Sequence, residues 1–294
     1  MVTFAFMNQQ AENLRQPKPE WLKVRLKRDS KYQETAALVR QHGMHTICTS
    51  GNCPNIKECW AMHTATFMIL GDVCTRACKF CNTKTGKPLP IDATEPQRLA
   101  EAVAGLKLKH AVITSVDRDE LPDFGASHWA KCIKAVQERN PDTTIEVLIP
   151  DFNGDKKLLD MIISAQPHII GHNLETVERL TPIIRSKAKY HVSLDVIKHS
   201  SRSGILSKSG IMLGLGETHH EVVKTMEDLR EAGCSLLTIG QYLQPTTQHH
   251  PVVTYIKPAV FEAYKIIAID LGFTSAECGP LVRSSYHAEQ QLVK

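Results

Sequence analysis

An alternation of short apolar runs with amphipathic stretches occupies the middle of the chain and limits the folds open to it. The apolar runs have the length of strands and lie at 64–70, 110–116, 143–150, 168–174, 190–197, 209–216 and 235–243. The stretches between them have the length and periodicity of helices and lie at 95–107, 126–140, 155–165, 175–184 and 218–233. Strands that are apolar on both faces and separated by helices indicate βα units, with a parallel sheet covered by helices.

We therefore predict an α/β protein, a partial (β/α) TIM-type barrel of about six βα units with N-terminal and C-terminal extensions. An open doubly wound sheet is the alternative. In both architectures, ligand sites form in the loops at the carboxyl ends of the strands. We expect the extension at 1–60, the barrel at 61–255, and a C-terminal helix and tail at 256–294.

The composition is that of an ordinary globular protein. The chain has 294 residues, of which 42% are hydrophobic and 22% charged, and this length suffices to bury a full core. No apolar run approaches the roughly 18 residues of a membrane span, and no basic segment precedes a long apolar one at the start. We expect a cytoplasmic protein with no membrane association. The net charge of +4 is too small to indicate a nucleic-acid partner.

Positive charge is concentrated near the N-terminus. Between Arg15 and Lys31, seven basic residues face two acidic ones. This arm is either a solvated segment or a docking surface for an acidic partner protein. The stretch after it, 31–43, is predicted to be a short helix that ends at Gly43.

Six of the nine cysteines fall within 34 residues, in two groups of three. In a reducing compartment, such clusters bind metal or perform chemistry more often than they form disulfides. The second group, Cys74, Cys78 and Cys81, follows the first predicted strand and so lies at the mouth of the sheet. Thiolates select zinc or iron–sulfur clusters, which take four ligands, so three cysteines leave one corner open or need a remote ligand. A structural zinc site with His63 or His110 as the fourth ligand is the alternative.

The Cys-x3-Cys-x2-Cys spacing, with the aromatic Phe80 before the last cysteine, resembles the signature of the radical S-adenosylmethionine (SAM) superfamily. The resemblance implies that Cys74, Cys78 and Cys81 hold a [4Fe–4S] cluster whose fourth iron binds the amino and carboxylate groups of SAM. One electron from that cluster then cleaves SAM to methionine and a 5′-deoxyadenosyl radical. The protein binds, orients and shields, while the cofactor carries the difficult chemistry.

The first group, Cys48, Cys53 and Cys59 in Cys-x4-Cys-x5-Cys spacing, resembles the lipoyl synthase family within that superfamily. Further segments carry the likeness over most of the chain: TSVDRDELPDFGASHW, GHNLETVERL, KSGIMLGLGET, GQYLQPTTQHHPV and VRSSYHA. In that family the upstream cysteines hold a second, auxiliary [4Fe–4S] cluster, with a serine of the Arg-Ser-Ser-Tyr motif as fourth ligand. That motif is 283–286 here. We expect Ser284 to be the ligand, although the sequence does not separate it from Ser285.

The resemblance also implies a reaction and its partners. Two sulfur atoms from the auxiliary cluster enter the sixth and eighth carbons of a protein-bound octanoyl-lysine to give lipoyl-lysine, the final step of protein lipoylation. The partners would be octanoylated lipoyl carrier domains, either 2-oxoacid dehydrogenase E2 subunits or the glycine-cleavage carrier protein. An electron donor such as ferredoxin or flavodoxin would also be needed.

Polar residues that follow other predicted strands are candidates for binding SAM. By resemblance, Ser115 and Asp117 would contact its amino group, Asn173 and Glu175 its carboxylate or ribose hydroxyls, and Arg185 its carboxylate, which arginine can grip with two donors. The alternatives are a helix cap at Asn173 and a surface acidic turn at Asp119 and Glu120.

Other conspicuous residues are expected to have structural roles. Cys132, Cys234 and Cys278 read as packing residues, because a free cysteine behaves as a small hydrophobe. The pairs 219–220 and 249–250 are histidines for which we expect surface or capping roles. Two other functions remain open at this point: another radical SAM enzyme, such as a biotin-synthase-like sulfur inserter or a methylthiotransferase, and a non-enzymatic zinc protein that binds nucleic acid or a partner.

Overall fold

A computed structural model of the chain describes residues 17–23, 30–62 and 64–285. Its main sheet has eight strands in the order β1-β2-β5-β6-β7-β8-β9-β10. Every neighbouring pair from β2 onward is parallel, and β1 (His45–Thr46) pairs antiparallel with β2. The parallel strands are β2 (Thr66–Ile69), β5 (His110–Ser115), β6 (Thr144–Leu148), β7 (Ile169–Gly171), β8 (Leu206–Leu213), β9 (Leu236–Gln241) and β10 (Ser275–Gly279).

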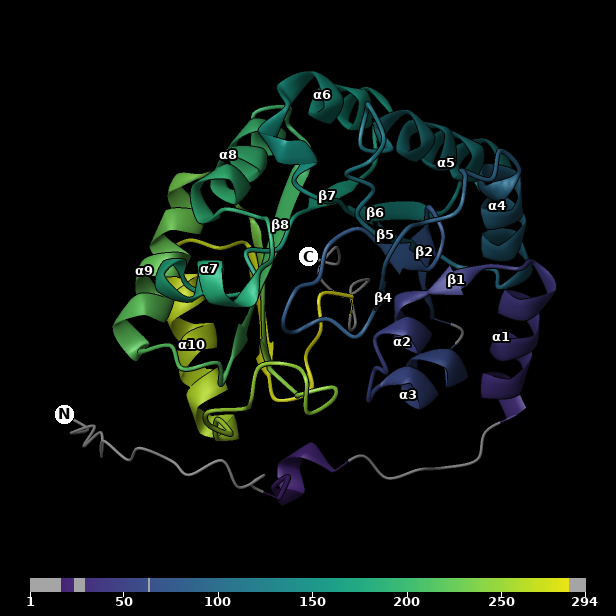
Figure 1. Cartoon of the computed structure of the whole chain (residues 1–294). Coiled ribbons are helices and arrows are strands. Elements are labelled where there is room, and N and C mark those ends of the chain that lie inside the picture. Colours follow the sequence, from purple (N-terminus) through teal and green to yellow (C-terminus); the bar gives the residue numbers. More distant parts are fainter. Residues whose placement is uncertain (1–16, 24–29, 63, 286–294) are drawn as a thin grey trace.

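Helices cover the outer face of the curved sheet, as Figure 1 shows. The long outer helices are α4 (Glu95–Gly105), α5 (Ala126–Arg139), α6 (Lys156–Ser164), α8 (Tyr190–Ser201), α9 (His219–Glu231) and α10 (Pro258–Asp270). Local sequence fixes where several of them begin. Asp155 accepts a hydrogen bond from the backbone of the first turn of α6, and Thr218 and Glu221 form a reciprocal capping box at the start of α9. Every residue of β2 and of β9 is buried, as expected of strands covered on both faces.

The predicted partial barrel is confirmed, with one element misassigned. The run 190–197 was predicted to be a strand, but it forms the first two turns of α8. The buried residues of α8 recur at helical spacing, at Tyr190, Ser193, Val196, Ile197 and Ser200, so the period of its apolar face is that of a helix. The sequence analysis also did not predict β10, which pairs with β9 within the region expected to hold a helix and tail. The helix expected at 175–184 is reduced to η3 (Glu178–Leu180) and α7 (Thr181–Ile184).

The residues before the barrel form η1 (Glu20–Leu22), α1 (Ser30–Gln41), α2 (Ile47–Ser50) and α3 (Ile56–Ala61). Here α1 packs on α3 and α2 contacts β2, while η1 lies apart from them in Figure 1. Tyr32 of α1 stacks on Trp60 of α3 at 5.4 Å, and the Thr35 hydroxyl donates to the Trp60 carbonyl at 2.7 Å. As predicted, α1 is followed by Gly43 in the left-handed region, with φ of 58°. Four of the seven basic residues of the arm, Arg15, Arg25, Lys27 and Arg28, lie outside the described residues.

Among the helices that the structure describes, none combines the length and apolar character needed to cross a membrane.

Candidate cluster and cofactor site

A cavity of about 690 Å³ opens at the carboxyl ends of the barrel strands. It brings together both cysteine groups, the candidate SAM residues and the C-terminal serines. The predicted site residues that line it are Cys48, Cys53, Cys74, Cys78, Phe80, Cys81, Ser115, Asp117, Asn173, Glu175, Arg185 and Ser284, and Ser285 lies beside them. Cys59, on α3, does not line it.

The second cysteine group lies on a loop that closes on itself. It leaves β2 through Leu70 and Gly71, both in the left-handed region, and its ends pair as the short parallel strands β3 (Val73–Cys74) and β4 (Lys84–Thr85). Figure 1 shows β4 in front of the main sheet, near the middle of the picture. The three cysteines of the loop all line the cavity.

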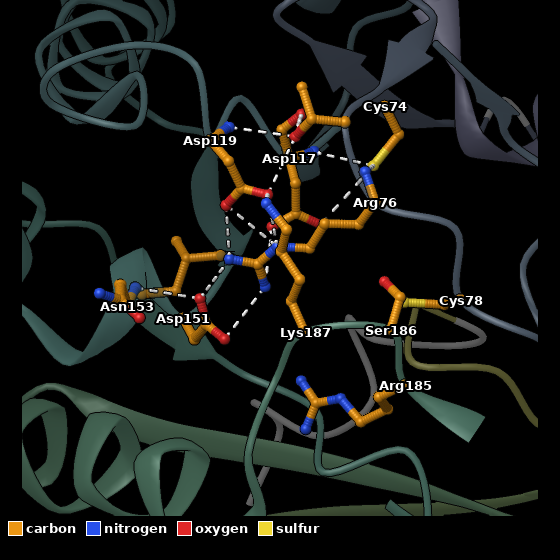
Figure 2. A network of polar contacts seen from close by, with 12 residues as sticks. Cys74, Arg76, Cys78, Asp117, Asp119, Asp151, Asn153, Arg185, Ser186 and Lys187 are labelled. Atoms are coloured by element: carbon orange, nitrogen blue, oxygen red, sulfur yellow. Dashed lines mark hydrogen bonds and ion pairs between the residues drawn. The ribbon is translucent and has the colours of Figure 1, made fainter. Parts of the chain in front are cut away.

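Arg76, between Cys74 and Cys78, fastens this loop to two neighbouring βα loops (Figure 2). Its Nε and Nη2 donate to Asp119 at 2.8 to 3.1 Å, and its Nη1 and Nη2 donate to Asp151 at 3.0 and 2.8 Å. Asp117 lies 3.3 Å from Nη1. The guanidinium thus uses all its donor directions, and its side chain is only 7% exposed.

These charges alter the protonation of the groups next to Cys74. Burial raises the pKa of Asp117 to about 6, although the Arg76 charge opposes the shift. Burial and the nearby Asp117 charge raise the pKa of the Cys74 thiol to about 12. Burial also acts to raise the pKa of Asp151. The hydrogen bonds from Arg76 prevail, however, and lower that pKa to about 2. Binding of a metal by Cys74 therefore has to displace a firmly held proton.

The segment 184–188 and the loop before α10 hold the same cysteine loop from its other side. The Ile184 carbonyl accepts from the Lys79 amide at 2.8 Å, and Ser186 Oγ accepts from the Ala77 amide at 3.2 Å. His249 Nε2 contacts the Cys81 carbonyl at 2.9 Å. His249 therefore supports the cysteine loop, a role that the expected surface or capping position did not include.

The first cysteine group is carried by two short helices. Cys48 lies on α2, Cys53 in the turn after it, and Cys59 on α3. The turn is closed by the Cys53 amide, which donates to the Cys48 carbonyl at 3.0 Å. Burial raises the pKa of the Cys53 thiol, and the charge of Arg283 opposes that shift.

The C-terminal tail enters the cavity beside this group. Asn55, between Cys53 and Cys59, donates from Nδ2 to the Leu281 carbonyl at 2.7 Å. The Asn173 amide donates to Ser284 Oγ, and the Thr66 hydroxyl donates to Ser285 Oγ, both at 2.7 Å. Both serines thus lie in the cavity, although Tyr286 of the same motif lies outside the described residues.

The candidate SAM residues surround the remaining wall. Ser115 Oγ is buried and has no hydrogen-bond partner among the described residues. Arg185 donates from Nη1 to the Leu174 carbonyl and to Ser193 Oγ, at 3.3 and 2.8 Å. Its other nitrogens make no hydrogen bond to the described part of the chain. Burial raises the pKa of Glu175, against the opposing charge of Arg185. The wall therefore offers an unsatisfied hydroxyl and a partly free guanidinium to a polar ligand.

The zinc alternative finds little support in this arrangement. His110 begins β5, at the far end of the strand from the cavity mouth, and its ring contacts Thr144 and Glu146. His63 lies outside the described residues. Four-coordinate zinc with Zn–S bonds of about 2.3 Å would hold its ligand atoms less than about 4 Å apart. Within the described residues, the one group of three metal-ligating side chains whose ligand atoms lie within 4.8 Å of one another is Glu95, His128 and Cys132, which is buried in the core away from both cysteine groups.

The remaining cysteines pack as expected. Cys132, Cys234 and Cys278 are buried within the apolar clusters of the core.

Sequence reasoning missed three residues that shape the site. Asp151 follows β6 and lies 75 positions from its partner Arg76, so no local pattern pairs them. Asp119, for which a surface turn was the alternative, has a side chain only 12% exposed because it binds Arg76. Ser186 contacts the Cys78 sulfur at 3.6 Å. Of these three residues, only Asp151 had a signal in the sequence, because it is a polar residue directly after a predicted strand.

Comparison with known proteins defines the class of this site. The sequence profile of the radical SAM superfamily matches residues 68–229. Solved structures support the fold: methylornithine synthase superposes with a TM-score of 0.55 at 10% identity, covering 78% of this chain and 77% of that one. A maturase of the [FeFe]-hydrogenase superposes with a TM-score of 0.56 at 12% identity, covering 82% of this chain and 62% of that one. The chain is a radical SAM protein, a class whose partial barrels bind SAM and a [4Fe–4S] cluster.

Full-length relatives define the family more narrowly. The lipoyl synthase of Bacteroides thetaiotaomicron is 58% identical over 275 residues, which cover 94% of this chain and 98% of that protein. The lipoyl synthase of Treponema denticola is 55% identical over 278 residues, covering 95% and 96%. The chain therefore belongs to the lipoyl synthase family of sulfur-inserting radical SAM enzymes. This result excludes the two other functions that the sequence left open, another radical SAM enzyme and a non-enzymatic zinc protein.

Proposed function

We propose that this chain converts a protein-bound octanoyl-lysine to lipoyl-lysine, with its two cysteine groups holding two [4Fe–4S] clusters in one cavity. Cys74, Cys78 and Cys81 hold the cluster that binds SAM, and Cys48, Cys53, Cys59 and Ser284 hold the auxiliary cluster. The observation that carries the proposal is that one cavity is lined by members of both groups and by Ser284.

The donor sets fit these groups. Each group supplies three thiols, which suit iron–sulfur clusters, and each leaves one corner to a different kind of ligand. When bound, the clusters and SAM supply a radical that removes hydrogen from unactivated carbons and the sulfur that replaces it. The chain's own contribution is to fix the two sites relative to each other, through the barrel strands and the tail.

The cavity wall supplies the contacts that orient SAM. Arg185 offers free guanidinium donors to a carboxylate, and Ser115 and Asp117 offer oxygen atoms to an amino group. Asn173 and Glu175 lie on the same wall and provide polar contacts for a carboxylate or for ribose hydroxyls. The buried wall keeps water from a reactive intermediate, which a radical enzyme needs.

We also propose that the macromolecular partners are octanoylated lipoyl carrier domains and an electron donor such as ferredoxin or flavodoxin. The octanoyl chain would be attached to a lysine of the carrier domain. From there its reacting carbons would have to reach the cavity between the two cysteine groups. A reducing, cytoplasmic location is supported by the cysteines, all of which are free of disulfide bonds.

Mass spectrometry of an octanoyl-lysine peptide tests the function directly. The reconstituted protein would be incubated anaerobically with the peptide, SAM and a strong reductant. We expect replacement of two hydrogens by two sulfurs, with 5′-deoxyadenosine formed alongside. Deoxyadenosine without sulfur gain would contradict the proposed substrate, and neither product, in a sample shown to contain its iron, would contradict the whole proposal.

A further inference from the structure

The sulfur atoms of Cys74, Cys78 and Cys81 each have a hydrogen-bonding group next to them, supplied by three separate segments. The amides of Arg76 and Asp117 donate to Cys74 Sγ at 3.4 and 3.3 Å. Ser186 Oγ lies 3.6 Å from Cys78 Sγ, and Thr83 Oγ1 lies 3.3 Å from Cys81 Sγ. Backbone amides are common beside cluster thiolates, but two side-chain hydroxyls are a feature of this sequence that the activity itself does not require.

The surroundings of Ser186 allow its hydroxyl to donate to Cys78. Its oxygen already accepts from the Ala77 amide at 3.2 Å, so its hydrogen is available to a second acceptor. Figure 2 shows Ser186 beside Cys78. Thr83 has no other hydroxyl partner among the described residues, and it stands two positions after Cys81 on the same loop. Once the cysteines are thiolates, the sulfurs can only accept, so both hydroxyls become donors.

We propose that the hydroxyls of Ser186 and Thr83 donate hydrogen bonds to the Cys78 and Cys81 thiolates and raise the reduction potential of the cluster that these cysteines hold. A donor next to a cluster sulfur stabilises the extra negative charge of the reduced state. The two residues thereby make the cluster easier to reduce by an electron donor. They act through the cysteines and are tuning residues rather than catalytic ones. The inference rests on the proposed assignment of Cys74, Cys78 and Cys81 to the SAM cluster.

The potential of that cluster, followed by electron paramagnetic resonance during anaerobic reduction of the holoenzyme, tests the inference. The signal that changes when SAM is added identifies the cluster. We expect Ser186→Ala and Thr83→Val each to shift its midpoint to more negative potential, and the double variant to shift it by about the sum. Ser186→Thr and Thr83→Ser keep a hydroxyl and should restore most of the original value.

Thr85→Val is the matched control. Its hydroxyl lies on the same loop but donates to the Arg76 carbonyl at 3.2 Å and to no sulfur, so its loss should leave the potential unchanged. Unchanged potentials in both Ser186→Ala and Thr83→Val would overturn the inference, as would an equal shift in Thr85→Val. A holoenzyme in which no signal responds to SAM would instead refute the assignment of the cysteines, which separates that failure from failure of the tuning.

Discussion

The two cysteine groups share a cavity, but the chain holds them by different kinds of contact. The loop of Cys74, Cys78 and Cys81 is fastened through Arg76 to carboxylates on two other loops, in a nearly dry environment. The tail beside Cys48, Cys53 and Cys59 is fastened by the neutral hydrogen bonds that Asn55, Thr66 and Asn173 donate.

This difference has an energetic consequence. Moving the Arg76 loop would separate buried ion pairs, whereas moving the tail would break neutral bonds worth about 1 kcal/mol each. A cluster that passes electrons repeatedly benefits from a fixed loop. A cluster that gives up its sulfur, as proposed for the auxiliary one, would have to be opened, and its proposed ligand Ser284 lies on the segment that costs less to move. The contrast thus matches the two roles proposed for the clusters.

Removal of Arg76 should have the largest effect, because it leaves Asp117, Asp119 and Asp151 close together with only the exposed Lys187, paired with Asp119, to balance them. We expect Arg76→Ala to lose both SAM cleavage and sulfur insertion and to lower the free energy of unfolding by about 3–5 kcal/mol. Anaerobic denaturant unfolding and product analysis would measure both. The matched control is Arg179→Ala, whose bidentate pair with Glu221 is 55% exposed on the arginine side and should cost at most about 1 kcal/mol. Equal losses in the two variants would contradict the ion-pair argument.

Loss of one auxiliary cysteine should separate the two activities. We expect Cys53→Ala to abolish sulfur insertion while 5′-deoxyadenosine formation stays largely intact, because Cys53 lies outside the loop that holds the other cluster. Cys78→Ala should abolish both. Cys278→Ala, a buried cysteine that does not line the cavity, is the control and should keep both products. If Cys53→Ala removed deoxyadenosine formation as completely as Cys78→Ala, the division of labour between the groups would be wrong.

The parts of this molecule that follow from local pattern were predictable from sequence. The position of Cys74, Cys78 and Cys81 after a strand predicted that they lie at the mouth of the sheet, and apolar runs between amphipathic helices predicted the barrel. The exception at 190–197 arose because a short run of alternating apolar residues fits a strand and a helix about equally well. Only packing against the neighbouring elements determined that this run forms the helix α8 and not a strand.

Pairings across long stretches of chain were beyond such patterns. Nothing near Arg76 in the sequence points to Asp151, and nothing near Asn55 points to Leu281, 226 positions away. Such contacts depend on which βα loops the curved sheet brings together. The sequence therefore located the ligands of the site but not the residues that hold those ligands in place.

Gly240 provides an intermediate test, directed at the tail alone. A Cβ added there would lie 2.1 Å from the Val282 carbonyl oxygen, far inside contact distance, so the tail would have to move. We expect Gly240→Ala to reduce sulfur insertion by on the order of tenfold to a hundredfold, since small misplacements of reacting groups cost that much. SAM cleavage should change little. In the control Gly105→Ala, the added Cβ makes ordinary contact at 3.4 Å and neither activity should fall.

The smallest stability effects are expected at the two serines of the tail, which differ in their effect on sulfur insertion. Ser285 shares its hydrogen bond with the buried Thr66, so Ser285→Ala should lower stability by about 1 kcal/mol and leave sulfur insertion in place. Ser284→Ala removes the proposed ligand together with an equally short hydrogen bond from Asn173, so it should lower stability by a similar amount but also abolish sulfur insertion. Both variants keep the tail backbone bonded to Asn55, so a difference between them reports on the hydroxyl and not on the position of the tail. The reverse ranking in the product assay would transfer the ligand role to Ser285.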